Sequence, residues 1–194
     1  MFILNFYRWW GLLICLVLSS ATGTFAAPRI SEFMAANVSR LADEDGDFSD
    51  WIEVHNPDNV AVPLAGYHLT DDAANLDKWT FPAVNLNPGA TLVVFASGKN
   101  RTAPSAPTAR LHTNFRLSAD GEYLALVAPD GVTVVSAFAP SYPRQFRNES
   151  FGLSLDFGPP LADDLVWSFF SIPTPGKANK GGSHAGPNIS VVDK

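Results

Sequence analysis

The sequence has little cysteine, because Cys15 is the only one among its 194 residues. Cys15 lies inside the apolar stretch Trp9–Leu18, which we expect to leave with a targeting segment. The remaining chain then has no disulfide, no cysteine-based metal site and no cysteine nucleophile. Ile14, and not a small residue, precedes Cys15, so lipidation of this cysteine is not expected. An exported domain without disulfides depends on its hydrophobic core for stability.

Charged residues are also scarce, at 16% of the chain, and the formal net charge is -6. The few basic residues form no dense cluster, and Lys99, Arg101 and Arg110 are expected to be solvated. Recognition of a phosphate backbone needs a positive surface, so we expect no nucleic-acid partner.

The longest apolar run lies at the start of the chain, where residues 1–26 are predicted to be a signal peptide. Arg8 supplies its positive region, Trp9–Leu18 its apolar region, and Thr24-Phe25-Ala26 a small-x-small cleavage site. The apolar run is short for a bilayer span. An uncleaved membrane anchor is the alternative interpretation. The mature chain is therefore expected to be secreted or held in the cell envelope, with no stable membrane span.

What the chain has is apolar material divided by turn residues. Hydrophobic residues make up 46% of it, and 15 prolines and 14 glycines are spread along it. No segment after the signal peptide keeps a helical period, whereas Trp51–Asn56 alternates as a strand does. Pro129-Asp130-Gly131 is a strong hairpin signal. Eight or nine short strands at this spacing predict an all-β fold, an immunoglobulin-like β-sandwich.

The pattern also predicts where the domain ends. We expect the β-sandwich over residues 28–140 and an irregular extension packing on it over 141–179. Within the extension, Phe151-Gly152-Leu153 and Trp167-Ser168-Phe169-Phe170 could add edge contacts. Residues 180–194 are interpreted as a linker, with the start of a truncated further domain at its end.

An acidic stretch precedes the alternating strand and is the main candidate for a metal site. Asp43, Asp45, Asp47 and Asp50 surround Gly46, and hard oxygen ligands on a bent loop suit calcium. The spacing does not match an EF-hand loop. The alternative interpretation is an acidic turn whose aspartates accept hydrogen bonds from backbone amides.

Catalytic groups are not expected. Glu53 with Asp50, or Asp71 with Asp72, could be paired acids, but neighbouring carboxylates on a strand or turn point apart. No Gly-x-Ser-x-Gly motif is present for a hydrolase triad. The histidines on predicted strands have no diagnostic zinc spacing; they are His55, His68 and His112.

Two tryptophans are candidates for a ligand or partner surface. Trp51 and Trp79, with Tyr67 and Tyr123, could form a platform on which sugars stack. The alternative interpretation places Trp51 and Trp79 in the core or over its edge.

An ordered set of motifs resembles the lamin tail domain family, with the bacterial secreted branch fitting better than the nuclear lamins. The resemblance covers about residues 28–139. It rests on Ile30-Ser31-Glu32-Phe33-Met34, Asp50-Trp51-Ile52-Glu53-Val54-His55-Asn56, the stretch 62–71, Lys78-Trp79-Thr80-Phe81-Pro82, the Pro88-Gly89 turn before Val93-Val94-Phe95, Leu111-His112-Thr113-Asn114-Phe115, Leu117-Ser118 and Glu122-Tyr123-Leu124-Ala125-Leu126.

The resemblance implies an immunoglobulin-like sandwich that serves as an accessory module of larger secreted or surface proteins. It implies no catalytic residues, and we expect no cofactor besides the candidate calcium. We therefore expect a non-catalytic extracellular module for interaction with a protein or a cell-surface component. The alternative is a carbohydrate-binding module, or the accessory part of a secreted hydrolase whose catalytic domain is absent from this chain.

Overall fold

The computed structural model describes residues 27–103, 110–154 and 166–179. These residues form twelve β-strands and no helix, which confirms the all-β prediction. The predicted signal peptide and the predicted linker 180–194 lie outside the described residues. No helix that could cross a membrane occurs in the part of the chain that the structure describes.

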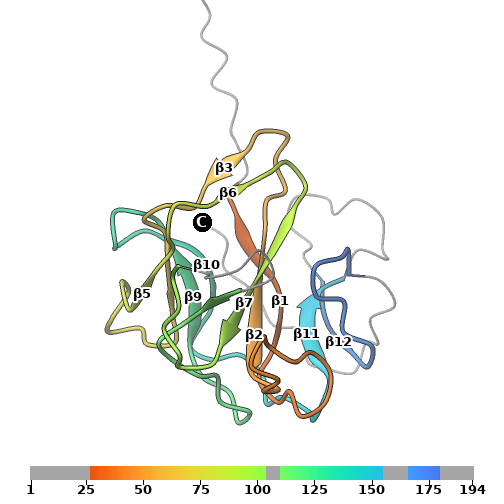
Figure 1. Cartoon of the computed structure of the whole chain (residues 1–194). Helices are drawn as coiled ribbons and strands as arrows, with labels where there is room; N and C mark the ends of the chain where they lie inside the picture. The colour runs from red at the N-terminus through yellow and green to blue at the C-terminus, as the bar shows by residue number, and fades with distance from the viewer. Residues whose placement is uncertain (1–26, 104–109, 155–165, 180–194) are drawn as a thin grey trace, which may run out of the picture.

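The larger sheet has six strands in the order β12-β11-β1-β2-β7-β8 (Figure 1). Its neighbours pair antiparallel except β7 and β8, which run parallel. The strands are β1 (Arg29–Met34), β2 (Asp50–His55), β7 (Thr91–Ala96), β8 (Leu111–His112), β11 (Ser150–Leu153) and β12 (Trp167–Phe170).

The second sheet has four strands in the order β10-β9-β4-β5, and a two-stranded sheet pairs β3 with β6. The predicted hairpin at Pro129-Asp130-Gly131 is confirmed, because it joins β9 to the antiparallel β10. These strands are β3 (Val62–Pro63), β4 (His68–Thr70), β5 (Trp79–Thr80), β6 (Asn85–Leu86), β9 (Leu124–Val127) and β10 (Val134–Phe138).

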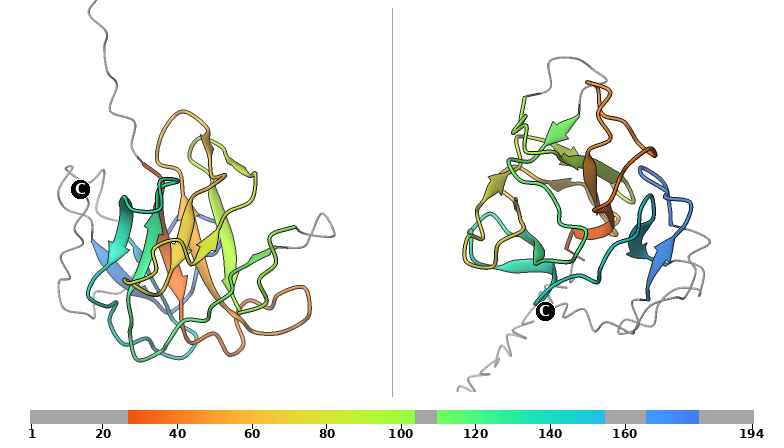
Figure 2. Two further views of the ribbon diagram at one scale, coloured as in Figure 1. Left: turned by 90° about the vertical axis from the view of Figure 1, so that its left-hand side faces the viewer. Right: turned by 90° about the horizontal axis from the view of Figure 1, so that it is seen from below.

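The main core lies between the two larger sheets, which face each other as layers (Figures 1 and 2). Ile52 and Val54 of β2 share this core with Leu69 of β4 and Leu126 of β9, and all four are fully buried. Alternation along β2 sends Ile52 and Val54 to the same face. The predicted sandwich is therefore observed.

The outer face of the six-stranded sheet is covered as well. Met34, Trp51, Val93 and Phe95 form a second buried cluster, against which Leu41 packs. Leu41 belongs to residues 35–49, the loop between β1 and β2, which we call the acidic loop. Because both faces of the central strands are covered, β2 is buried at Trp51 as well as at its core positions.

The segment after residue 140 is more regular than the sequence indicated. It supplies β11 and β12, and β11 pairs with β1 through Glu32–Gly152 and Phe33–Phe151. The expectation of an irregular extension over 141–179 is corrected, because the two segments that were expected only to add edge contacts form the paired strands β11 and β12. Phe151 drives this pairing because its ring contacts Phe33, Phe138, Trp167 and Phe169.

This packing predicts that residues beyond 140 stabilise the sandwich. Phe151 is 3% exposed and Phe146 is 52% exposed, although both contact Phe169. We expect Phe151→Ala to lower the free energy of unfolding by about 3–5 kcal/mol. The control Phe146→Ala should cost less than about 1 kcal/mol. Urea midpoints measure both, and equal losses in the two variants would contradict the assignment of β11 to the fold.

Candidate functional site

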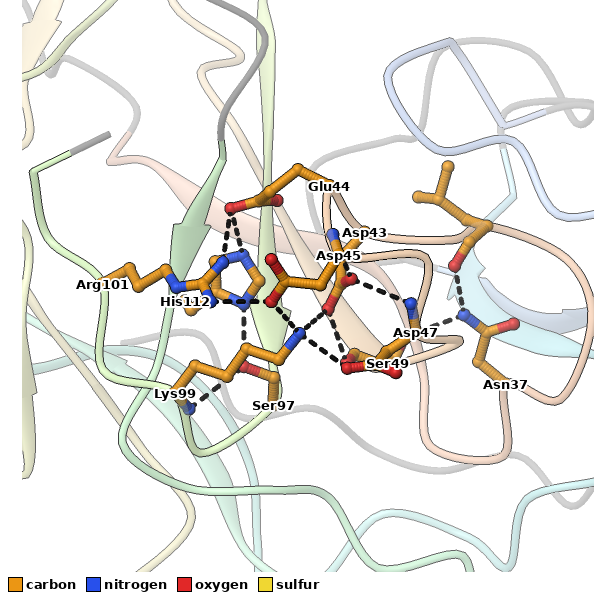
Figure 3. A network of polar contacts seen from close by, with 11 residues as sticks. Asn37, Asp43, Glu44, Asp45, Asp47, Ser49, Ser97, Lys99, Arg101 and His112 are labelled. Atoms are coloured by element: carbon orange, nitrogen blue, oxygen red, sulfur yellow. Dashed lines mark hydrogen bonds and ion pairs between the residues drawn. The ribbon is translucent and has the colours of Figure 1, made fainter. Parts of the chain in front are cut away.

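Strand register brings three separate segments to one end of the six-stranded sheet. Asp50 begins β2 opposite Ala96, which ends β7, so the acidic loop and the residues after β7 are neighbours. His112 on β8 pairs with Phe95. The side chains that meet there form what we call the charged hub (Figure 3): Asp43, Glu44, Asp45, Asp47, Ser97, Lys99, Arg101 and His112.

Asp43 organises the acidic loop. Its Oδ1 accepts hydrogen bonds from the backbone N–H groups of Asp45 and Asp47, at 3.0 Å each. Its Oδ2 accepts one from the Ser49 hydroxyl at 2.9 Å. Gly46 adopts a φ of 84°, in the left-handed region that glycine enters without strain. The predicted acidic turn, with aspartate capping backbone amides, is therefore confirmed at Asp43.

Lys99 places a cation at the centre of the loop. Its Nζ lies 2.6 Å from Asp43 Oδ2, 2.6 Å from Asp45 Oδ2 and 2.9 Å from Asp47 Oδ2. The three ammonium protons match three acceptors. The Asp43 side chain is 0% exposed and that of Lys99 is 18% exposed, so this pair is shielded from solvent. The expectation that Lys99 is solvated was wrong, because the register of β2 and β7 was not visible in the sequence.

Arg101 joins the same network from the other side. Its Nη2 lies 2.7 Å from the Asp45 oxygen that also binds Lys99, and its Nη1 lies 3.0 Å from Glu44 Oε1. Hydrogen bonds from Arg101 and then Lys99 lower the pKa of Asp45 to about 2. Burial opposes ionisation of Asp43, but the hydrogen bonds led by that from Lys99 outweigh it and lower its pKa. Both aspartates are thus ionised at neutral pH.

His112 connects the hub to the core. Its Nε2 lies 3.0 Å from Glu44 Oε1, and its Nδ1 lies 2.8 Å from the Ser97 hydroxyl. An ionised Glu44 only accepts, so the proton is assigned to Nε2 and Nδ1 accepts from Ser97. Serine, histidine and glutamate in series resemble a hydrolase triad. Ser97 is 2% exposed and also accepts the Lys99 N–H, so a substrate carbonyl could not reach its oxygen.

Asp50 is not part of the hub. Its Oδ1 accepts the backbone N–H of Asn37 at 3.0 Å, and burial raises its pKa to about 6. Among the described residues, the group with ligand atoms within 4.8 Å of one another is Asp43, Asp45 and Asp47. The predicted four-aspartate set is therefore corrected to three. Asp50 opens a strand, and its side chain turns toward the start of the acidic loop.

The tryptophan surface is also corrected. Trp51 is 0% exposed in the second cluster, and Trp79 is 2% exposed in the main core, where its ring meets Phe81. Neither indole can stack on a sugar. The alternative interpretation, which placed both in the core, is confirmed. Alternation in the sequence could not show this for Trp51, because it does not reveal that the outer face of the six-stranded sheet is covered.

The hub already contains the positive charge that a metal would supply. Calcium in proteins takes about six to eight oxygen ligands, and it would meet the Lys99 ammonium at the shared centre of the three carboxylates. The internal lysine relieves the repulsion between the aspartates without a metal. Calcium binding by Asp43, Asp45 and Asp47 stays a prediction, and it requires displacement of Lys99.

The Lys99→Met variant distinguishes the role of the Lys99 ammonium from that of a bound calcium ion. We expect it to lose about 2 kcal/mol of stability, because the buried Asp43 carboxylate loses a charged partner. We expect calcium to raise the melting temperature of the variant, whose three carboxylates lack an internal cation. The native chain should show a smaller shift in the same titration, because calcium must first displace Lys99. A shift of the native chain as large as that of the variant would contradict the role of Lys99.

Comparison with known proteins agrees with this architecture. A search among curated proteins found no match. The family model described as Lamin Tail Domain matches residues 22–140, which is more than half of the chain. The match includes the acidic loop, Lys99, Arg101 and His112, and it ends before β11 and β12. The all-β sandwich and this match together show that the chain belongs to the lamin tail domain family.

Proposed function

We propose that this lamin tail domain is a non-catalytic extracellular module that binds a protein or a cell-surface component through its acidic loop. The proposal depends on one observation. Ion pairs and hydrogen bonds fix the acidic loop against the sheet, while apolar and acidic side chains of the same loop remain exposed to solvent. Phe48 is 46% exposed and Val38 is 40% exposed. The Asp47 side chain is 66% exposed although its carboxylate contacts Lys99.

Rigidity favours recognition because little conformational entropy is then lost on binding. The loop is fixed at several points besides the hub. Asn37 Nδ2 donates to the carbonyls of Leu41 and Ser49, at 2.7 and 2.8 Å. Asn148 Oδ1 accepts the backbone N–H groups of Val38 and Ser39, at 2.9 Å each. An exposed aromatic ring among fixed carboxylates suits a partner surface with apolar and cationic groups.

The setting of the module is part of the same proposal. The signal-peptide pattern of residues 1–26 supports export to the cell envelope or beyond. We further propose that the module is an N-terminal accessory domain of a larger secreted protein, within the bacterial secreted branch of the family that matches residues 22–140. The buried Ser97 supports a non-catalytic role. A carbohydrate-binding module remains the rival, although its motivating tryptophans are buried.

Binding to isolated cell envelopes and to a glycan array tests the proposal, with loop variants as the probe. We expect Phe48→Ser to weaken envelope binding by about tenfold or more. An aromatic side chain that becomes buried in the interface with a partner contributes more than about 1.4 kcal/mol of binding free energy. Its melting temperature should stay near that of the native chain, because Phe48 is exposed. The matched control is Val132→Ser, which changes a 70% exposed residue in the turn between β9 and β10.

Two results would contradict the proposal. One is envelope binding that Phe48→Ser and Val132→Ser weaken to the same extent. The other is specific binding to the glycan array that Phe48→Ser leaves intact, which would favour the carbohydrate-binding alternative.

A further inference from the structure

Two glutamates lie buried side by side on the outer face of the six-stranded sheet. Glu32 on β1 pairs with Glu53 on β2, and both are 0% exposed. A β-bulge between Ile30 and Glu32 shifts the register of β1 there, so Glu32 and Glu53 come opposite each other in the pairing. Two ionised carboxylates without water would repel strongly. The pair therefore needs either a cation or a proton.

A segment from the far end of the described chain covers the pair. We call residues 174–179 the strap. Thr174 donates to Glu32 twice, from its backbone N–H at 3.0 Å and from its hydroxyl at 2.9 Å. The Gly176 N–H donates to Glu53 Oε2 at 2.6 Å. The strap ends at Asn179, whose Nδ2 donates to the Ser31 carbonyl at 2.9 Å.

The strap lies close against the strands below it. A Cβ built on Gly152 of β11 would lie 2.8 Å from Asn179 Nδ2 and 2.9 Å from Glu32 Cγ. Such distances are shorter than real Cβ contacts, so glycine is required for the strap to dock. The strap, β11 and the glutamate pair form one packed unit.

Hydroxyl and backbone N–H groups, which carry no charge, donate hydrogen bonds to the two carboxylates. Besides the strap, the Ser31 hydroxyl donates to Glu53 at 2.6 Å and the Ser150 hydroxyl donates to Glu32. Thr91 of β7 adds a further hydrogen bond to Glu53. Charged or titratable side chains of the packed elements, apart from the pair itself, are few: Arg29 on β1, Asp50 and His55 on β2, and Lys177 on the strap.

We propose that the strap is a pH-sensitive clasp, closed while the Glu32–Glu53 pair holds a proton and released when the pair ionises. The geometry supports this because the strap contacts both carboxylates and shields both from water. Release would hydrate the charges and let the two side chains separate. This device is independent of the charged hub and of the proposed recognition loop.

Titration of the pair sets the direction of the effect. Burial is the main influence on both groups, and it raises the pKa of Glu32 above its ordinary value. It raises the pKa of Glu53 to about 7, against hydrogen bonds from Ser31 and Gly176. A raised pKa means that the closed state binds the proton more tightly than the open state does. The clasp is therefore most stable below the ordinary glutamate pKa and weakens as the pH rises toward 7.

Hydrogen exchange on the full chain measures the clasp. After correction for the intrinsic effect of pH on exchange, we expect strap opening to rise by roughly five- to tenfold per pH unit between about pH 5 and 7, which corresponds to loss of one proton. Opening should level off above that range. Exchange in β7, which reports global unfolding, should also rise with pH because unfolding releases the same proton, but β7 should stay far better protected than the strap.

Variants assign the effect to the pair. Glu53→Gln and Glu32→Gln each keep the shape but remove one ionisable group, so the pH dependence of strap exchange should fall in each variant and should be absent in the double variant. Glu149→Gln is the charge-matched control and should behave as the native chain. The proposal is overturned if native exchange of the strap does not change with pH, if Glu53→Gln keeps the native dependence, or if the strap is as well protected as β7.

Discussion

The ammonium group of Lys99 fixes the end of the sandwich that carries the candidate site. It lies within 2.9 Å of an oxygen of Asp43, Asp45 and Asp47, and it comes from the residues that follow β7. This one side chain ties a long loop to the six-stranded sheet and cancels the repulsion among its carboxylates. The described part of the chain contains no cysteine, so this ion pair, and not a disulfide, links the loop to the sheet there.

Acidic side chains are buried in two different environments on the six-stranded sheet. At the hub, Asp43 is buried beside a cation, which lowers its pKa. At the centre of its outer face, Glu32 and Glu53 are buried with neutral donors, and burial raises the pKa of both. The first arrangement strengthens as carboxylates ionise, and the second strengthens as they are protonated. On the same sheet, ionised carboxylates thus hold the acidic loop, whereas protonation of a carboxylate favours docking of the strap.

Local patterns in the sequence predicted the sandwich well, because alternation in β2 and the Pro129-Asp130-Gly131 turn specify local structure directly. They also located the acidic turn at Asp43. They could not predict Lys99 as its partner, because 56 positions separate the two residues and only the β2–β7 register joins them. The Glu32–Glu53 pair was missed for a similar reason, since a β-bulge sets its register and the strap that buries it follows two strands predicted to be irregular.

The account depends on a specific coupling between Asp43 and Lys99, and a double-mutant cycle measures it most directly. The cycle compares the unfolding free energies of the native chain, Asp43→Asn, Lys99→Met and the double variant. Because Asp43 is fully buried and the pair is 2.6 Å apart, we expect a coupling energy of about 2 kcal/mol. A coupling below about 0.5 kcal/mol would show that the two residues act independently and would contradict the account.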